Sequence, residues 1–554
     1  MECLNQAPSL AYEAPSLQVI LTLSAFLIGV NVLHDIIDDL LHVGLLAQLI
    51  LGAVFGAPLA NILPSEVQKS IQALGYLGLL LIVFEGGMTT RLDILSSPKT
   101  LILAFLTGTI GILMPIALSM ILLPFAYSFT YLESFVVGVS LSSTSLGTTL
   151  AVIGTASPKK DEKEKNDPIG DTDGIRLQSI GEVRLPSSST DTPNANRADF
   201  PVTQNGQKLS GIMNTRIGTI LIGAALLDDI IALVLSSVVR SLGSVANGEE
   251  QLKPWPIIRP FLSSFILILG TVILVRFVIK PLAPFSIRIQ NQSQRVYGIL
   301  AKFHLIWPRL GMLLWLAIIC AFVSIADEID STDLIGAFCA GAFMIYAYKA
   351  LPERKFERLD PNHAFDEVKM IMHRILVPFF FASIGFAIPI KELFQGGTVW
   401  RGVLFSGLMA CAKVMACIPV LIISFYGDRI TNWSKMFIKT LFGKKGFDQQ
   451  VNQNSRIESG GHMNQRPNRI WLPALFLGCS LVARGEIGFL IINIGRQVDI
   501  LSCSSNSPTA LLAFDVGVWA ITLNTFIGPT LIGILLRSKG CLEEIEAGKW
   551  GIVS

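Results

Sequence analysis

Long apolar runs separated by polar segments dominate the chain and predict its architecture. A helix needs about 20 mostly apolar residues to cross the hydrocarbon core of a bilayer. The sequence holds thirteen runs of this kind, centred on residues 17–33, 43–60, 70–88, 100–123, 134–155, 215–239, 260–279, 310–326, 332–348, 375–390, 402–426, 471–495 and 510–536. We therefore expect an all-α polytopic membrane protein with about thirteen transmembrane helices.

The composition supports a membrane protein and argues against several functional classes. Of the 554 residues, 51% are hydrophobic and only 15% are charged, whereas a soluble globular chain carries about 25% charged residues. The eight cysteines show no CxxC spacing, which argues against a zinc site or a disulfide framework. Neither a Walker A nor a GxGxxG motif is present. We expect no enzyme activity, no cofactor and no nucleic-acid partner, and transport driven by an ion gradient.

Basic residues are distributed unevenly between the predicted loops. With an external N-terminus, the inner loops and tail hold 33 of the 43 Lys and Arg residues, and the outer loops hold 7. Cytosolic segments of membrane proteins are enriched in Lys and Arg, so we expect an external N-terminus and a cytosolic C-terminus. This count does not distinguish the plasma membrane from an internal membrane.

Two long polar segments interrupt the series of spans. Both lack the apolar residues needed to pack, and we expect them to be largely disordered cytosolic loops. The chain then divides into an external tail over 1–16, spans 1–5 over 17–155, a disordered loop over 156–213, spans 6 and 7 over 214–279, spans 8–11 over 280–426, a flexible loop over 427–470, spans 12 and 13 over 471–537, and a cytosolic tail over 538–554.

Two adjacent carboxylates occupy the middle of the sixth run. Asp228 and Asp229 lie in the segment ALLDDIIALV, from Ala225 to Val234. One ionised Asp at the centre of a membrane helix costs on the order of 2.5–3.5 kcal/mol, and a second like charge beside it adds to that cost. Consecutive helical residues point about 100° apart, so one carboxylate can meet a fixed cation while the other faces a water-filled cavity. A purely structural pair, satisfied by neighbouring helices, is the alternative.

A buried cation is available in the eleventh run. Lys413 lies in GLMACAKVMACIPVLI, far from either end of the span. A buried lysine needs an acidic partner to keep its proton, and Asp228 is the candidate by elimination. A Lys–Asp pair that serves only the specificity of the fold remains a second explanation.

Two further runs contain residues that disfavour a continuous lipid-facing helix. The fifth run reads SLSSTSLGTTLAVIG from Ser140 to Gly154, and the twelfth reads GCSLVARGEIGFLI from Gly478 to Ile491. Unwound backbone at membrane depth is tolerated where it lines a cavity, although small residues are also typical of tight helix packing. A break at Gly485 would let Arg484 and Glu486 approach each other. The site-lining candidates from these two runs are Ser143, Thr144, Ser145, Thr148, Arg484 and Glu486.

The two interrupted runs hold equivalent positions if the chain consists of two six-span halves joined by the seventh span. Paired interruptions of this kind are typical of inverted-repeat transporters whose site lies at the midplane. We therefore expect two inverted six-helix repeats, a linker helix and two broken crossing helices. A buried carboxylate binds either a proton or a hard cation such as Na⁺ or K⁺, and competition at one site becomes exchange when only the loaded carboxylate crosses the barrier.

At this point the residues match a known family. The chain resembles the monovalent cation–proton antiporter superfamily, and within it a fungal-like member of the sodium/hydrogen exchanger type. The matching motifs are LIVFEGGMTTRL (Leu81–Leu92), SLSSTSLGTT, LLDDIIALV, GAFCAGAFM (Gly336–Met344), VPFFFASIGFAI (Val377–Ile388) and LVARGEIGFLI. Their order along the chain, together with the aspartate pair, carries the resemblance.

The resemblance implies roles for the residues. Asp229 would bind the cation (Na⁺ or K⁺) or a proton, Asp228 would pair with Lys413, and exchange would be electrogenic. Spans 4–6 and 11–13 would form a mobile core, and spans 1–3 and 8–10 a homodimer scaffold. Glu85 is similar to an acid in related exchangers, but an ordinary carboxylate at the membrane interface explains it equally well.

Two other functions fit a similar scaffold. One is a gated monovalent cation channel or sensor, and the other is a sodium-coupled solute symporter. A proteoliposome assay separates exchange from conduction, because an exchanger collapses a preset pH gradient when cation is added, whereas a channel needs a proton ionophore to do so.

Overall fold

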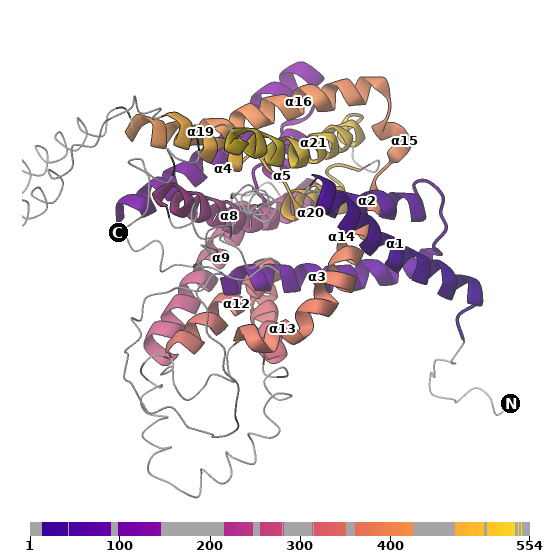
Figure 1. Ribbon diagram of the computed structural model, residues 1–554, viewed down its shortest axis with the longest axis horizontal. Helices are drawn as coiled ribbons and strands as arrows, with labels where there is room; N and C mark the ends of the chain where they lie inside the picture. Colours follow the sequence, from indigo (N-terminus) through magenta and orange to yellow (C-terminus); the bar gives the residue numbers. More distant parts are fainter. Residues whose placement is uncertain are drawn as a thin grey trace, which may run out of the picture.

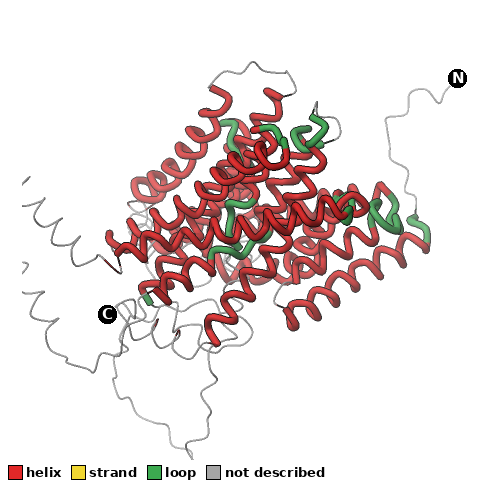
Figure 2. The backbone as a smooth tube through the Cα atoms, turned by 90° about the horizontal axis from the view of Figure 1, so that it is seen from above, coloured by secondary structure: helices red, strands yellow, loops and turns green. Residues whose placement is uncertain are grey.

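A computed structural model describes residues 14–41, 44–89, 98–145, 215–246, 255–279, 315–350, 361–423, 471–502 and 507–537, together with the isolated residues 281, 313, 425, 541 and 545. These residues form helices and short loops, with no β-strand among them (Figure 2). The predicted cytosolic loops over 156–213 and 427–470 lie outside the described residues, as does most of the tails over 1–16 and 538–554.

Helical residues occur within each of the thirteen apolar runs. Eight of the described helices are long and apolar enough to cross a membrane. The number of membrane crossings and the inverted repeat remain predictions. The main helices are α1 (Leu17–Leu41), α2 (Gly44–Phe55), α3 (Ser65–Thr89), α4 (Pro98–Tyr127), α5 (Tyr131–Ser140), α8 (Arg216–Ala246), α9 (Trp255–Ile273), α12 (Asp333–Ala350), α13 (Pro361–Ile371), α14 (Val377–Ala387), α15 (Ile390–Leu393), α16 (Gly396–Val414), α19 (Trp471–Ser480), α20 (Glu486–Gln497) and α21 (Ala510–Arg537).

The helices pack as two bundles (Figure 1). In the first, which we call the site bundle, α4 packs against α5, α8 and α16, while α21 packs against α16, α19 and α20. In the second, the support bundle, α2 packs against α1 and α14, and α3 packs against α12 and α14. The bundles meet where α14 contacts α20 and where α12 contacts α8, and α9 packs against α8 and α12. The seventh apolar run therefore bridges the two bundles.

Helix α5, in the fifth apolar run, begins before the run and ends inside it. Helix α5 starts at Tyr131, because Thr130 and Glu133 form a reciprocal capping box at its N-terminus. It ends at Ser140, and the Ser- and Thr-rich residues 141–145 that follow form a turn and irregular backbone. Hydroxyl side chains compete with the helix for backbone hydrogen bonds, which explains the early end.

The tenth span is longer than predicted. Helical structure runs from α13 through a π-helical segment (Met372–Leu376) into α14, whereas the apolar run covers 375–390. Hydropathy missed the first part because the segment PNHAFDEVKMI is polar along much of its length. Such an amphipathic extension is typical of a helix that continues beyond the hydrocarbon core.

Helices α2 and α14 approach each other at backbone distance. A Cβ atom at Gly52 would lie 2.2 Å from the carbonyl oxygen of Ala382, and one at Gly385 would lie 2.2 Å from that of Leu49. No side chain fits at either position without a shift of the backbone. Because helices in lipid associate through van der Waals packing rather than a hydrophobic driving force, this contact holds the support bundle together.

The variant Gly385→Ala should force α2 and α14 apart. Overpacking of this kind lowers the free energy of unfolding by about 1–3 kcal/mol. The measurement is thermal unfolding of the purified, detergent-solubilised chain. Gly407→Ala in α16 is the matched control, because a Cβ there meets nothing within 4 Å and alanine is favoured in helices. Equal melting temperatures for the two variants would contradict the assigned contact.

Candidate ion-binding site

The two adjacent aspartates lie near the middle of α8 in different surroundings. The Asp228 side chain is fully buried, whereas Asp229 is partly exposed. Their side chains leave the helix about 100° apart, as consecutive helical residues do. The two carboxylates therefore face different surroundings in this structure.

Asp228 is held by a lysine and a hydroxyl. Its Oδ2 atom lies 2.5 Å from Lys413 Nζ of α16 and accepts a hydrogen bond from Thr144 Oγ1 at 2.7 Å. Lys413 also donates to Thr144 Oγ1 at 2.9 Å, which closes a triangle of three polar groups. Both charged side chains have no exposed surface. These bonds pair the two buried charges, as a low-dielectric interior requires, while Asp228 Oδ1 has no hydrogen-bond partner among the described residues.

The interrupted parts of the fifth and twelfth runs lie against each other. Residues 481–485 separate α19 from α20, and residues 141–145 follow α5. The backbone N–H of Ser145 donates to the carbonyl of Ala483 at 2.9 Å, and Thr144 Oγ1 lies 3.4 Å from the carbonyl oxygen of Leu481. A Cβ atom at Gly485 would lie 2.7 Å from the Ser145 side chain, so glycine permits the close approach.

The structure thus brings Ser143, Thr144 and Ser145 to the twelfth run, and Thr144 also to Asp228. The fourth predicted lining residue of the fifth run, Thr148, lies outside the described residues.

Arg484 does not form the expected pair with Glu486. Its fully buried guanidinium donates to the carbonyl oxygen of Ser143, and no ion pair joins it to Glu486 in the part of the chain that the structure describes. Backbone carbonyls released by an interrupted helix are strong acceptors, which explains this choice of partner. Arg484 lies close enough to Asp228 for their charges to interact.

Glu486 begins α20 and is partly exposed. Its charge is favoured at this helix N-terminus by the helix dipole. The charges of Glu486 and Asp228 both act on Asp229. The Asp229 Oδ1 atom is buried and has no hydrogen-bond partner among the described residues. No hydrogen bond or ion pair holds Asp229 among the described residues, and two acidic groups lie near it.

Glu85 lies in the support bundle, apart from the aspartate pair. Its two oxygens lie 3.0 Å from Lys369 Nζ and 3.4 Å from His373 Nε2. Glu85 of α3 is thus ion-paired with α13 and with the π-helical segment that follows it. This geometry matches an ordinary interfacial carboxylate better than a ligand of the transported ion.

Sequence reasoning missed Asp515, which lies in α21 with 2% of its surface exposed. Its Oδ1 atom has no hydrogen-bond partner among the described residues. The signal was present in the sequence, because an acid within the apolar run 510–536 is as costly as the pair in the sixth run. The segment contains no paired or interrupted motif to draw attention to it.

Comparisons with known proteins identify the family of the chain. Residues 22–165 and 199–538 match the family model described as sodium/hydrogen exchanger, transmembrane. A Na⁺/H⁺ antiporter of Enterococcus hirae is 20% identical over 322 residues, and the match covers 58% of this chain and 62% of that protein. The high-affinity Na⁺/H⁺ antiporter NhaS3 of Synechocystis is 22% identical over 490 residues, which cover 88% of this chain and 76% of the relative.

The fold also resembles a solved structure. The sodium proton antiporter MjNhaP1 from Methanocaldococcus jannaschii at pH 8 superposes with a TM-score of 0.50 at 14% identity, over 96% of this chain and 98% of that one. Identity at this level supports a shared fold alone. The family match spans both bundles, both interrupted runs and the aspartate pair. The chain is a multi-pass membrane protein and belongs to the sodium/hydrogen exchanger family.

Proposed function

We propose that the chain exchanges a monovalent cation, Na⁺ or K⁺, for protons, and that the two compete for Asp229. The observation that carries the proposal is the unequal state of the two acids. Each acid keeps a buried Oδ1 without a hydrogen-bond partner among the described residues. Asp228, however, is bound through Oδ2 to Lys413 and Thr144, whereas no described residue binds Asp229 by a hydrogen bond or an ion pair. Carboxylate oxygens suit hard cations, and the acidic neighbours of Asp229 favour binding of one positive charge.

The fixed ion pair lets the second acid change state alone. With Asp228 neutralised by Lys413, the net charge near the site is set by whether Asp229 holds a cation, a proton or neither. An empty, ionised carboxylate is costly at membrane depth, so the loaded states cross the barrier and the empty state does not. This coupling yields exchange rather than leakage.

In the proposed mechanism, the two bundles move relative to each other. The site bundle carries Asp229, Lys413 and both interrupted runs, and it meets the support bundle through α14–α20 and α8–α12. We propose that the site bundle shifts against the support bundle to expose Asp229 alternately to the two sides of the membrane. A homodimer built through the support bundle, and electrogenic exchange, belong to the same proposal.

Asp229→Asn should abolish cation-driven collapse of a preset pH gradient in proteoliposomes, because an amide cannot exchange a proton for a cation. The assay uses a pH-sensitive dye and tests Na⁺, K⁺ and Li⁺ in turn, with and without a clamped membrane potential. Yield and melting temperature should match those of the unmodified chain, since no described residue pairs with Asp229. Full exchange by folded Asp229→Asn protein would refute the site assignment.

Asp228→Asn should act mainly on stability and leave some transport. It leaves Lys413 buried without a counter-ion, and breaking a buried pair costs about 3–5 kcal/mol. The double variant Asp228→Asn/Lys413→Met removes both charges and should recover part of that loss in thermal unfolding. An Asp228→Asn protein that folds normally but is as inactive as Asp229→Asn would show that the two roles are wrongly divided.

A further inference from the structure

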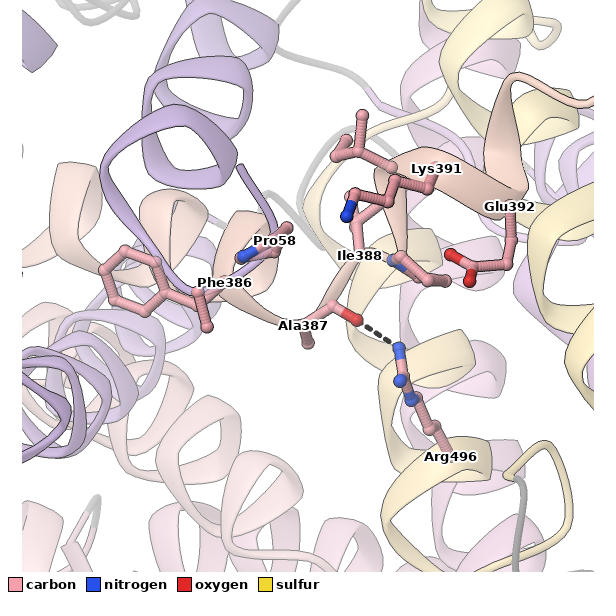
Figure 3. A pocket seen from close by; sticks show the side chains of 10 residues that line it. Pro58, Phe386, Ala387, Ile388, Lys391, Glu392 and Arg496 are labelled. Atoms are coloured by element: carbon pink, nitrogen blue, oxygen red, sulfur yellow. Dashed lines mark hydrogen bonds between the residues drawn. The ribbon is translucent and has the colours of Figure 1, made fainter. Parts of the chain in front are cut away.

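A cavity of about 260 Å³ lies between the two bundles, at the end of the molecule that we call the outer end (Figure 3). The outer end is defined by the loops over 56–64 and 388–395, which the charge count predicts to be external. The support bundle lines the cavity with the residues after α2 and at the end of α14, and the site bundle contributes Arg496 of α20. The lining residues are Ala57, Pro58, Phe386, Ala387, Ile388, Pro389, Ile390, Lys391, Glu392 and Arg496.

Arg496 joins the bundles across this cavity. Its guanidinium donates to the carbonyl oxygen of Ala387, the last residue of α14 (Figure 3). The final carbonyls of a helix lack partners within the helix, so Ala387 offers a free acceptor at the negative end of the α14 dipole. The bond therefore ties the site bundle to the support bundle at the outer end.

The rest of the Arg496 environment belongs to the site bundle and the adjoining linker. The guanidinium lies over the Phe514 ring of α21, 4.8 Å from its centroid. The charge of Arg496 acts on Asp515, the buried acid beside Phe514, and so does the charge of Glu392 in the cavity wall. Asp515 Oδ1 has no hydrogen-bond partner among the described residues. Asp515 thus lies within electrostatic range of Arg496 and directly follows Phe514 in α21.

We propose that Arg496 is the outer latch of the transporter, bound to Ala387 when the outer end is closed and to Asp515 when it opens. The inference rests on the proposed alternating access and adds a positioning residue to it. Stacking on Phe514 keeps the guanidinium between the two acceptors, so opening exchanges one hydrogen bond for another. The buried carboxyl of Asp515, unexplained by the ion site, then has a role in the open form.

The latch acts on the ion site through α20. This helix begins at Glu486, beside Asp229, and carries Arg496 in its last turn. A single rigid helix thus links the outer closure to the element that lines the site. Arg496 is a positioning residue, because it contacts neither the cation nor Asp229.

The experiment measures how often the outer end opens, using Ile388→Cys as a reporter. Ile388 is 1% exposed and lines the cavity. Its labelling by a bulky sulfonated maleimide is followed on the full chain in lipid nanodiscs by site-resolved mass spectrometry. Arg496→Gln should raise the labelling rate by about tenfold, because losing one hydrogen bond to a charged donor shifts a two-state equilibrium by roughly that factor. Lys391→Gln, which removes another cation from the same wall, should leave the rate unchanged.

Asp515→Asn should move labelling in the opposite direction. Neutralising the acceptor of the open form favours the closed form, so the rate should fall below that of the reporter alone. Opposite signs cannot come from simple loosening of the fold, which raises labelling in every variant. Phe514→Leu, which removes only the stacking face, provides a second opening variant if Arg496→Gln folds poorly.

Two outcomes would overturn the latch. The first is an unchanged rate in Arg496→Gln and Phe514→Leu, and the second is a rise in Asp515→Asn. Labelling does not require transport, so its result is independent of the Asp229→Asn assay. Opposite shifts without any exchange activity would sink the proposed function and keep the latch, whereas exchange without the shifts would do the reverse.

Discussion

The ion pair between Lys413 and Asp228 is the interaction on which the rest of the site depends. Both side chains are fully buried, and neither charge would be tolerable alone at this depth. The pair and the Thr144 hydroxyl connect α16, α8 and the interrupted part of the fifth run. One fixed charge pair therefore sets the relative position of three segments that are distant in sequence, and it leaves Asp229 as the variable acid beside them.

The interrupted helices solve a second electrostatic problem. Unwound backbone inside a membrane leaves donors and acceptors that water cannot reach. Here the backbone N–H of Ser145 donates a hydrogen bond across the two interruptions to the carbonyl of Ala483, and Arg484 donates one to the carbonyl of Ser143. Arg484 donates through Nη1 to this carbonyl and forms no ion pair with Glu486 in the described part of the chain, so the charge of Glu486 acts on Asp229. The departure from the expected Arg484–Glu486 pair thus makes the site more acidic where a cation has to bind.

The sequence was most informative where a residue type is costly. Asp228, Asp229, Lys413 and Arg484 stood out because charges inside apolar runs need partners, and the structure brings Asp228 and Lys413 into contact. Contacts that depend on three-dimensional packing were not accessible. The choice of Ser143 as the partner of Arg484 depends on where α5 ends and on how residues 141–145 lie against the twelfth run, which a linear sequence does not show. The polar first half of the tenth helix escaped detection for another reason, because a search for apolar runs does not register an amphipathic extension.

Helix α20 also has a mechanical consequence. Arg496 comes ten positions after Glu486, and at a rise of 1.5 Å per residue the two lie about 15 Å apart along the helix axis. A tilt of about 10° about the Glu486 end would then displace the Arg496 end by about 2.6 Å, nearly the length of a hydrogen bond. The helix is a lever arm: a reorientation too small to disturb the packing around Asp229 is large enough at the far end to exchange one bonding partner for another.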